Sequence, residues 1–173
     1  MVESAVLLIF PFCMVYAAVS DMISMTIANR VSLLLVGAFF LLAFLTGMPS
    51  TDIGLHLGTG AIVLLVTFTL FALGVMGGGD AKLMAATAVW FGFNLSLVEY
   101  LTTSAVLGGA LTLGLLVYRK SVWATFTGNN ILLRHFADAK AGIPYGVALG
   151  IGGLITYTQT PLAQWAMQRL SAL

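Results

Sequence analysis

The chain has 173 residues, of which only 8% are charged: seven are lysine or arginine and six are aspartate or glutamate. Hydrophobic residues make up 60% of the chain, and its mean hydropathy is +1.06. A soluble domain carries roughly a quarter charged residues, so this composition excludes a soluble globular protein and an intrinsically disordered one. The net charge of +1 argues against nucleic-acid binding. The single cysteine, Cys13, excludes a disulfide framework and a four-cysteine zinc site. A polytopic membrane protein remains.

Six uncharged, apolar runs follow one another along the chain, and each is about as long as a membrane-spanning helix. Continuous runs favour helices over the alternating pattern of a membrane β-barrel. We therefore expect an all-α polytopic fold that forms one transmembrane domain over residues 1–173. A turn at 47–50 separates the second run from the third, and the glycines at 77–79 end the third. The expected spans are about 4–21, 31–47, 54–74, 80–95, 99–118 and 143–159.

Two further segments are expected outside these spans. Residues 119–142 form the longest polar segment, which is interpreted as an interfacial loop held by its aromatic residues, or as a docking surface for a substrate. Near the C-terminus, Thr160 and Pro161 look like a helix N-cap followed by proline at the first helical position. Apolar residues then recur at helical spacing, so residues 160–173 are expected to form an interfacial helix.

The basic residues predict how the chain is oriented in the membrane. With the N-terminus outside, six of the seven lysines and arginines fall on the inner side, and only Arg169 falls on the outer side. The opposite orientation reverses these numbers. The positive-inside rule therefore predicts an outer N-terminus and a cytoplasmic 119–142 loop.

The acidic residues separate into two groups. Ionisable side chains at membrane depth are costly and by default indicate function. Asp21 ends the first expected span, and Asp80 opens the fourth directly after three glycines. The predicted topology places both at the inner face, so we expect them to form a pair. The other four acids are explained as boundary or loop residues: Glu3, Asp52, Glu99 and Asp138.

A pair of close carboxylates suits the hydrolysis of a peptide bond by water. One carboxylate takes a proton from the water, and the other, protonated, polarises the carbonyl group. Because the two cannot easily be ionised together, they share a proton and titrate as a pair. The preceding glycines at 77–79 allow positive φ and add no side-chain bulk. They are interpreted either as a helix-breaking turn or as a place where an extended substrate backbone approaches closely.

Three sequence elements resemble motifs of the type IV prepilin peptidases, which are membrane aspartyl proteases of the GxGD class. The segment Gly77–Met84 matches the second-aspartate motif of that family. Asp21 followed by Ile27 and Asn29 matches the first motif, and Ile143–Gly146 matches a third element that opens the last span. The chain looks most like the short forms associated with tight-adherence, or Flp-type, pili. This resemblance covers essentially the whole chain, including the six spans.

The resemblance implies a GxGD-type protease fold in the inner membrane, with its active site at the cytoplasmic face. The implied substrates are prepilins, which carry a basic leader followed by an apolar helix. By resemblance, Asp21 and Asp80 are the catalytic pair, while Lys82 also has a plain interpretation as an inside-facing anchor. The residues implied to bind substrate or shape the site are Gly77, Gly78, Gly79, Lys82, Asn29, Pro144 and Gly146.

The chain departs from the family pattern in two places. Ala28 stands where the first motif usually has proline. Longer relatives carry a cytoplasmic region with paired CxxC motifs and a methyltransferase activity, whereas this chain has only Cys13. We therefore expect no metal, no methyl-donor cofactor and no methylation.

Two other functions compete with this interpretation. A small ion or solute transporter also uses intramembrane acids and glycine-broken helices. A non-enzymatic membrane protein of pilus or secretion assembly would need neither Asp21 nor Asp80. Replacing either residue with asparagine distinguishes the three: a peptidase loses precursor processing, a transporter loses flux, and an assembly protein loses little.

Overall fold

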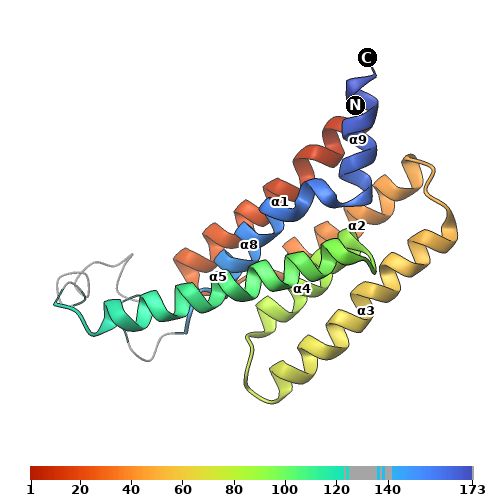
Figure 1. Cartoon of the computed structure of the whole chain (residues 1–173). Helices are drawn as coiled ribbons and strands as arrows, with labels where there is room; N and C mark the ends of the chain where they lie inside the picture. Colours follow the sequence, from red (N-terminus) through yellow and green to blue (C-terminus); the bar gives the residue numbers. More distant parts are fainter. Residues whose placement is uncertain (123, 125–135, 137, 139–141, 173) are drawn as a thin grey trace.

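The structure of the chain is a computed structural model that describes residues 1–122, 124, 136, 138 and 142–172. Helices account for all the regular structure in this part of the chain (Figure 1). Each of the six expected spans largely coincides with one α-helix, and the last also takes in a short 3₁₀ helix. Most of the expected 119–142 loop lies outside the described residues. The helices are α1 (Val2–Ser24), α2 (Asn29–Leu45), α3 (Ser50–Ala72), α4 (Gly78–Phe91), α5 (Leu95–Arg119), α8 (Tyr145–Thr156), the short 3₁₀ helix η1 (Tyr157–Gln159) and α9 (Pro161–Ser171).

Three helices, α1, α3 and α5, are long and apolar enough to cross a membrane by length and composition. The apolar helix α2 is shorter, with 17 residues. The helices α4 and α8 have 14 and 12 residues. A 14-residue helix is about 21 Å long at 1.5 Å per residue, which is less than the roughly 30 Å hydrocarbon core. The chain is thus an all-helical membrane protein, whereas six crossings and an outer N-terminus remain predictions.

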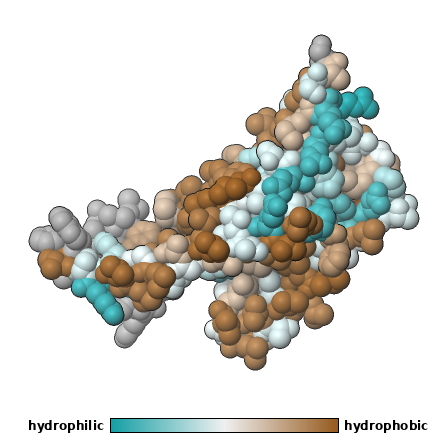
Figure 2. All heavy atoms as spheres, in the orientation of Figure 1, coloured by the Kyte–Doolittle hydropathy of each residue, from teal (hydrophilic) through white to brown (hydrophobic). Residues whose placement is uncertain are grey.

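The surface of the bundle is apolar over most of the long helices. Large side chains such as Phe44, Leu65 and Val117 are exposed on α2, α3 and α5. Figure 2 shows hydrophobic surface over α3 and α5, and a band of hydrophilic residues along α9. Helices that expose apolar side chains in this way suit contact with lipid acyl chains.

The helix α8 lies at the centre of the bundle, where it packs against α1, α5 and α4. Its glycines make this close approach possible. A Cβ atom on Gly150 would lie 2.8 Å from Ala18 Cβ and 2.9 Å from the Met14 carbonyl oxygen, and one on Gly152 would collide with Ser104. Small residues let helix backbones approach closely in a membrane. The glycines of α8 therefore allow α1 and α5 to pack closely against it.

One end of the bundle, which also holds both chain termini (Figure 1), is filled by aromatic rings. The Phe10 ring stacks on Tyr157 with centroids 4.5 Å apart and lies 5.2 Å from Trp90. The Trp90 indole N–H donates to the Leu35 carbonyl at 3.0 Å, and the Tyr157 hydroxyl donates to the Val6 carbonyl. We call this cluster of Phe10, Trp90, Phe91, Tyr100 and Tyr157 the aromatic end.

The C-terminal helix α9 begins as the sequence predicts. Thr160 is its N-cap, with a side-chain oxygen that accepts from the Ala163 N–H at 3.3 Å, and Pro161 is its first residue. The helix packs against α1 at the aromatic end. Its placement in the membrane interface remains a prediction.

Candidate active site

Asp21 lies in the last turn of α1, at the end of the bundle opposite the aromatic end (Figure 1). Its side chain is only 5% exposed, and its Oδ2 accepts a hydrogen bond from the Gly146 backbone N–H at 2.7 Å. Met25 ends α1 in the left-handed conformation, with φ 53°, and turns the chain back toward the bundle. The hydrogen bond fixes the orientation of the carboxylate between α1 and the start of α8.

Asp80 lies in the first turn of α4, whose N-cap is Gly77. Its carboxylate is partly buried and lies close enough to Asp21 for the two charges to interact. The start of a helix carries unpaired N–H groups and a partial positive charge, which suits a carboxylate. The sequence thus places an acid where the helix itself stabilises negative charge.

Both carboxylates line a single cleft with a volume of about 630 Å³. Its walls come from α1, α3, α4 and α5, from the turn between α3 and α4, and from the start of α8 with the residues before it. The apolar part includes Leu70, Val75 and Met76, and Thr112 of α5 lies among the lining residues. The cleft is therefore a partly apolar hollow that holds two acids, and we call this the cleft end of the bundle.

The three glycines before Asp80 leave room for neighbouring side chains, because they carry no Cβ atom. A Cβ atom on Gly77 would lie 2.8 Å from Asp80 Oδ2, and one on Gly78 would lie 3.1 Å from the Phe71 ring. None of the three has a positive φ; that conformation occurs at Gly74, where α3 ends. The prediction that the triplet ends the third helix is wrong, because α3 already ends at Ala72. Instead, α4 begins at Gly78, two residues earlier than predicted.

The three motifs meet at the side chain of Ile27. A Cβ atom on Gly79 would lie 3.3 Å from Ile27 Cβ, and one on Gly146 would lie 2.7 Å from Ile27 Cδ1. The same Cβ on Gly146 would also lie 2.8 Å from Asp21 Oδ2. Glycine at 79 and 146 therefore lets α4 and α8 close around Ile27 and Asp21. Pro144 is the N-cap of α8 and lies two residues before Gly146.

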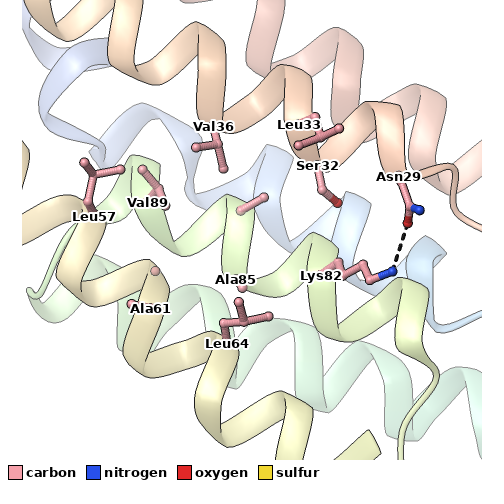
Figure 3. A pocket seen from close by; sticks show the side chains of 12 residues that line it. Asn29, Ser32, Leu33, Val36, Leu57, Ala61, Leu64, Lys82, Ala85 and Val89 are labelled. Atoms are coloured by element: carbon pink, nitrogen blue, oxygen red, sulfur yellow. Dashed lines mark hydrogen bonds between the residues drawn. The ribbon is translucent and has the colours of Figure 1, made fainter.

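Lys82 and Asn29, by contrast, do not line the cleft. The Lys82 Nζ donates to Asn29 Oδ1 at 3.0 Å, and both residues lie at a separate groove between α2, α3 and α4 (Figure 3). Positions 80 and 82 point in different directions because successive helical residues are about 100° apart. Gly78 likewise does not line the cleft but faces Phe71 in a hollow beside α3, so part of the expected set is turned toward other surfaces.

The cleft also contains a side chain that sequence reasoning did not single out, that of Tyr145. The Tyr145 ring occupies the space beside Gly108 of α5, where a Cβ atom would collide with it. Its place between Pro144 and Gly146 was the available signal, since both flanking residues belong to a motif. The tyrosine brings a phenol hydroxyl to a site that otherwise holds two acids.

The described residues contain no group of three or more histidine, cysteine, aspartate or glutamate side chains that could hold a metal ion. Among the described residues that line the cleft, the titratable side chains are those of Asp21, Asp80 and Tyr145. The lone cysteine, Cys13, is buried within α1.

Comparison with known protein families gives a match. A model of the type IV leader peptidase family matches residues 8–113, which include both acids and the helices from α1 to most of α5. Neither the curated proteins nor the solved structures gave a match. Since the matched region covers more than half of the chain, this protein belongs to the type IV leader peptidase family and is a membrane peptidase.

Proposed function

We propose that this peptidase removes the basic leader from Flp-type prepilins at the cytoplasmic face of the inner membrane, with Asp21 and Asp80 as its catalytic pair. The observation that carries the proposal is the shared cleft: two acids from distant parts of the chain line one hollow of about 630 Å³. Family membership favours a peptidase over a transporter or an assembly protein.

The two carboxylates would divide the acid and base roles. One, ionised, takes a proton from a water molecule as the water oxygen attacks the scissile carbonyl carbon. The other, protonated, gives its proton to the carbonyl oxygen. The carboxyl that took the proton of the water then gives it to the amide nitrogen, and the carbon–nitrogen bond breaks. The other carboxylate takes a proton back from a hydroxyl of the tetrahedral intermediate as the carbonyl re-forms. The Gly146 N–H would hold the Asp21 carboxylate in place through this sequence.

The walls of the cleft suit a precursor whose cleavage site borders an apolar helix. Leu70, Val75 and Met76, at the end of α3 and in the turn after it, form an apolar side of the cleft. The helix α3 packs mainly against α4, and α5 mainly against α8. Figure 2 shows a notch in the surface between the α3–α4 hairpin and the projecting part of α5. An apolar helix could reach the acids sideways from the bilayer through this notch.

The charges at the cleft end support a cytoplasmic site. Arg30 in the first turn of α2, Lys82 in α4 and Arg119 at the end of α5 lie toward this end, whereas Arg169 lies in α9. The positive-inside rule places the basic end in the cytoplasm, where a prepilin leader would be found.

The test is co-expression with a candidate Flp-type prepilin, with leader removal measured by the mass of the mature product. We expect Asp21→Asn and Asp80→Asn each to lower the cleavage rate by about 10²- to 10⁴-fold, the usual contribution of one general acid or base. Both variants should still insert into the membrane.

The matched control is Asp52→Asn, which changes an exposed acid in the first turn of α3, at the opposite end of that helix. This variant should process the precursor at the wild-type rate. Normal maturation in either cleft variant would refute the catalytic pair.

A further inference from the structure

A groove of about 450 Å³ runs along α4 on a different side from the cleft (Figure 3). The helix α2 packs against α4 on one side of the groove and α3 packs against it on the other. Between them α4 presents the small side chains of Ala85 and Ala86, which leave the space unfilled. Val36 of α2 and Leu57 and Leu64 of α3 form apolar walls. Apolar walls of this kind suit the acyl chains of a bilayer.

One end of this groove is positively charged. The Lys82 ammonium has three N–H donors, and its hydrogen-bond partner is the neutral amide oxygen of Asn29 at 3.0 Å. No ion pair joins Lys82 to a carboxylate in the part of the chain that the structure describes. Ser32, one turn along α2 from Asn29, brings a hydroxyl to the same end. Two of the ammonium donors thus remain for an external acceptor.

The surroundings of Lys82 make an anionic partner favourable. A second apolar hollow, of about 570 Å³, shares Lys82, Ala61 and Leu64 with the groove and extends toward Phe68 and Phe71. The ammonium is therefore flanked by apolar surface on two sides. A charge at the edge of the hydrocarbon region is costly unless it is paired or reaches water.

We propose that this groove binds an anionic phospholipid, with the phosphate at Lys82 and Asn29 and an acyl chain along Ala85 and Ala86. The site requires no protein partner, because the bilayer itself supplies the ligand. Basic pockets between membrane helices commonly recognise lipid head groups in this way. The lipid would also explain why Lys82 and Asn29 face away from the acids.

A lipid fits this groove better than the substrate helix does. A helix with its side chains is about 10–12 Å wide, whereas the groove lies between α2 and α3, which both pack directly against α4. A basic leader beside the helix would also be repelled by the Lys82 ammonium. This second argument rests on the proposed function; the lipid site itself does not.

The experiment is native mass spectrometry of the full chain in detergent, with equal amounts of dioleoylphosphatidylglycerol and dioleoylphosphatidylcholine. Wild-type protein should retain the anionic lipid about fivefold more than the zwitterionic one, as expected for one basic residue near the membrane surface. The Lys82→Gln variant should lose this preference, and Lys82→Arg should keep it. Arg169→Gln is the matched control, since Arg169 lies in α9 against Trp165, and it should retain the wild-type ratio.

A second variant tests the groove without touching the charge. Ala61 is exposed and lines the groove, so Ala61→Phe should fill it and lower the retention of both lipids. If Lys82→Gln does not fold, lipid retention by Ala61→Phe tests the lipid site instead. Equal retention of the two lipids by wild type, an unchanged preference in folded Lys82→Gln, or full retention by Ala61→Phe would each overturn the lipid site. The lipid site would also be overturned if wild-type protein retained a synthetic prepilin peptide in place of lipid and Ala61→Phe abolished this retention. The readout is binding, so failure of the lipid site leaves the cleavage proposal untouched.

Discussion

The two ends of the bundle are built from the same helices and packed in opposite ways. At the aromatic end, α1 contributes Phe10 and α4 contributes Trp90 and Phe91, while Tyr157 follows directly after α8, and the Phe10 and Trp90 side chains are fully buried. At the cleft end, the same three helices contribute Asp21, the glycines around Asp80, and Gly146, and they enclose a hollow of about 630 Å³.

The difference suggests that one end of each helix stabilises the fold and the other end forms the active site. The packed aromatic rings at one end fix the relative positions of the helices, because a close-packed core is hardly compressible. The other end can then hold two acids near one another and leave a hollow between them. Changes at the aromatic end should therefore lower stability more than the cleavage rate of folded protein, and changes at the cleft end should do the reverse.

The largest effect should come from Phe10→Ala, which removes the ring at the centre of the aromatic end. Buried phenylalanine replaced by alanine costs about 3 kcal/mol or more of folding free energy. We expect the low end here, because a helix in lipid loses packing contacts but little hydrophobic transfer energy. Thermal unfolding in detergent measures the change. Phe12→Ala, which alters a ring 67% exposed on the same helix, should leave the unfolding temperature nearly unchanged. An equal loss in both variants would contradict the packed end.

The next largest effect should come from Gly146→Ala at the cleft end. The added Cβ would lie 2.8 Å from Asp21 Oδ2 and 2.7 Å from Ile27 Cδ1, so the carboxylate must move. A displacement of about 1 Å in a catalytic group costs about 10²-fold in rate. Prepilin cleavage at saturating substrate measures it.

Gly109→Ala is the control for that substitution, because a Cβ atom there would meet no atom within 4 Å. The control variant should cleave as fast as wild type. If Gly146→Ala cleaved as fast as wild type too, the hydrogen bond from Gly146 to Asp21 would not matter for catalysis.

Most of the helices could be predicted from the sequence, because long apolar runs between charges leave few alternatives. The expected start of α4 is two residues too late, because glycine usually breaks a helix, whereas Gly78 and Gly79 belong to the first turn of α4. The expected end at residue 159 includes η1, since α8 itself ends at Thr156. Glycines that permit close packing look the same in sequence as glycines that end helices.

The site could be predicted only in part. Scarcity of charge singled out Asp21 and Asp80, which do line one cleft. The direction of Lys82 could not be predicted, because the buried residues of α4 are apolar on several of its faces and give no amphipathic pattern. Tyr145 was missed because a tyrosine among apolar residues carries no signal of its own. The local sequence does not determine which residues surround a helix, because its neighbours depend on how the whole bundle packs.

A smaller effect is expected from Tyr145→Phe, which keeps the ring beside Gly108 and removes only the hydroxyl from the cleft. If the phenol donates one hydrogen bond to the substrate, its loss costs about 1 kcal/mol, or about fivefold in kcat/KM. A rise in KM alone would indicate substrate binding, and a fall in kcat would indicate a role in the transition state. Tyr16→Phe, at an exposed position on α1, is the control, and unchanged kinetics in both variants would leave Tyr145 a packing residue only.

The smallest effect is expected from Thr160→Ala, which removes the N-cap of α9 at the aromatic end. The Thr160 hydroxyl oxygen accepts from the Ala163 N–H at 3.3 Å and is fully buried. Losing such a cap costs about 0.5 kcal/mol, the low end of the usual range, because a hydrogen bond of 3.3 Å is long. Thermal unfolding should show a small decrease, Thr160→Ser should restore it, and amide exchange in α9 should quicken only in the alanine variant. Cleavage by folded protein should stay at the wild-type rate, because Thr160 is at the far end of the bundle from Asp21 and Asp80. A fall in cleavage larger than the loss of stability would mean that the two ends are coupled through α8 and α1, and that the packed end does more than hold the helices in place.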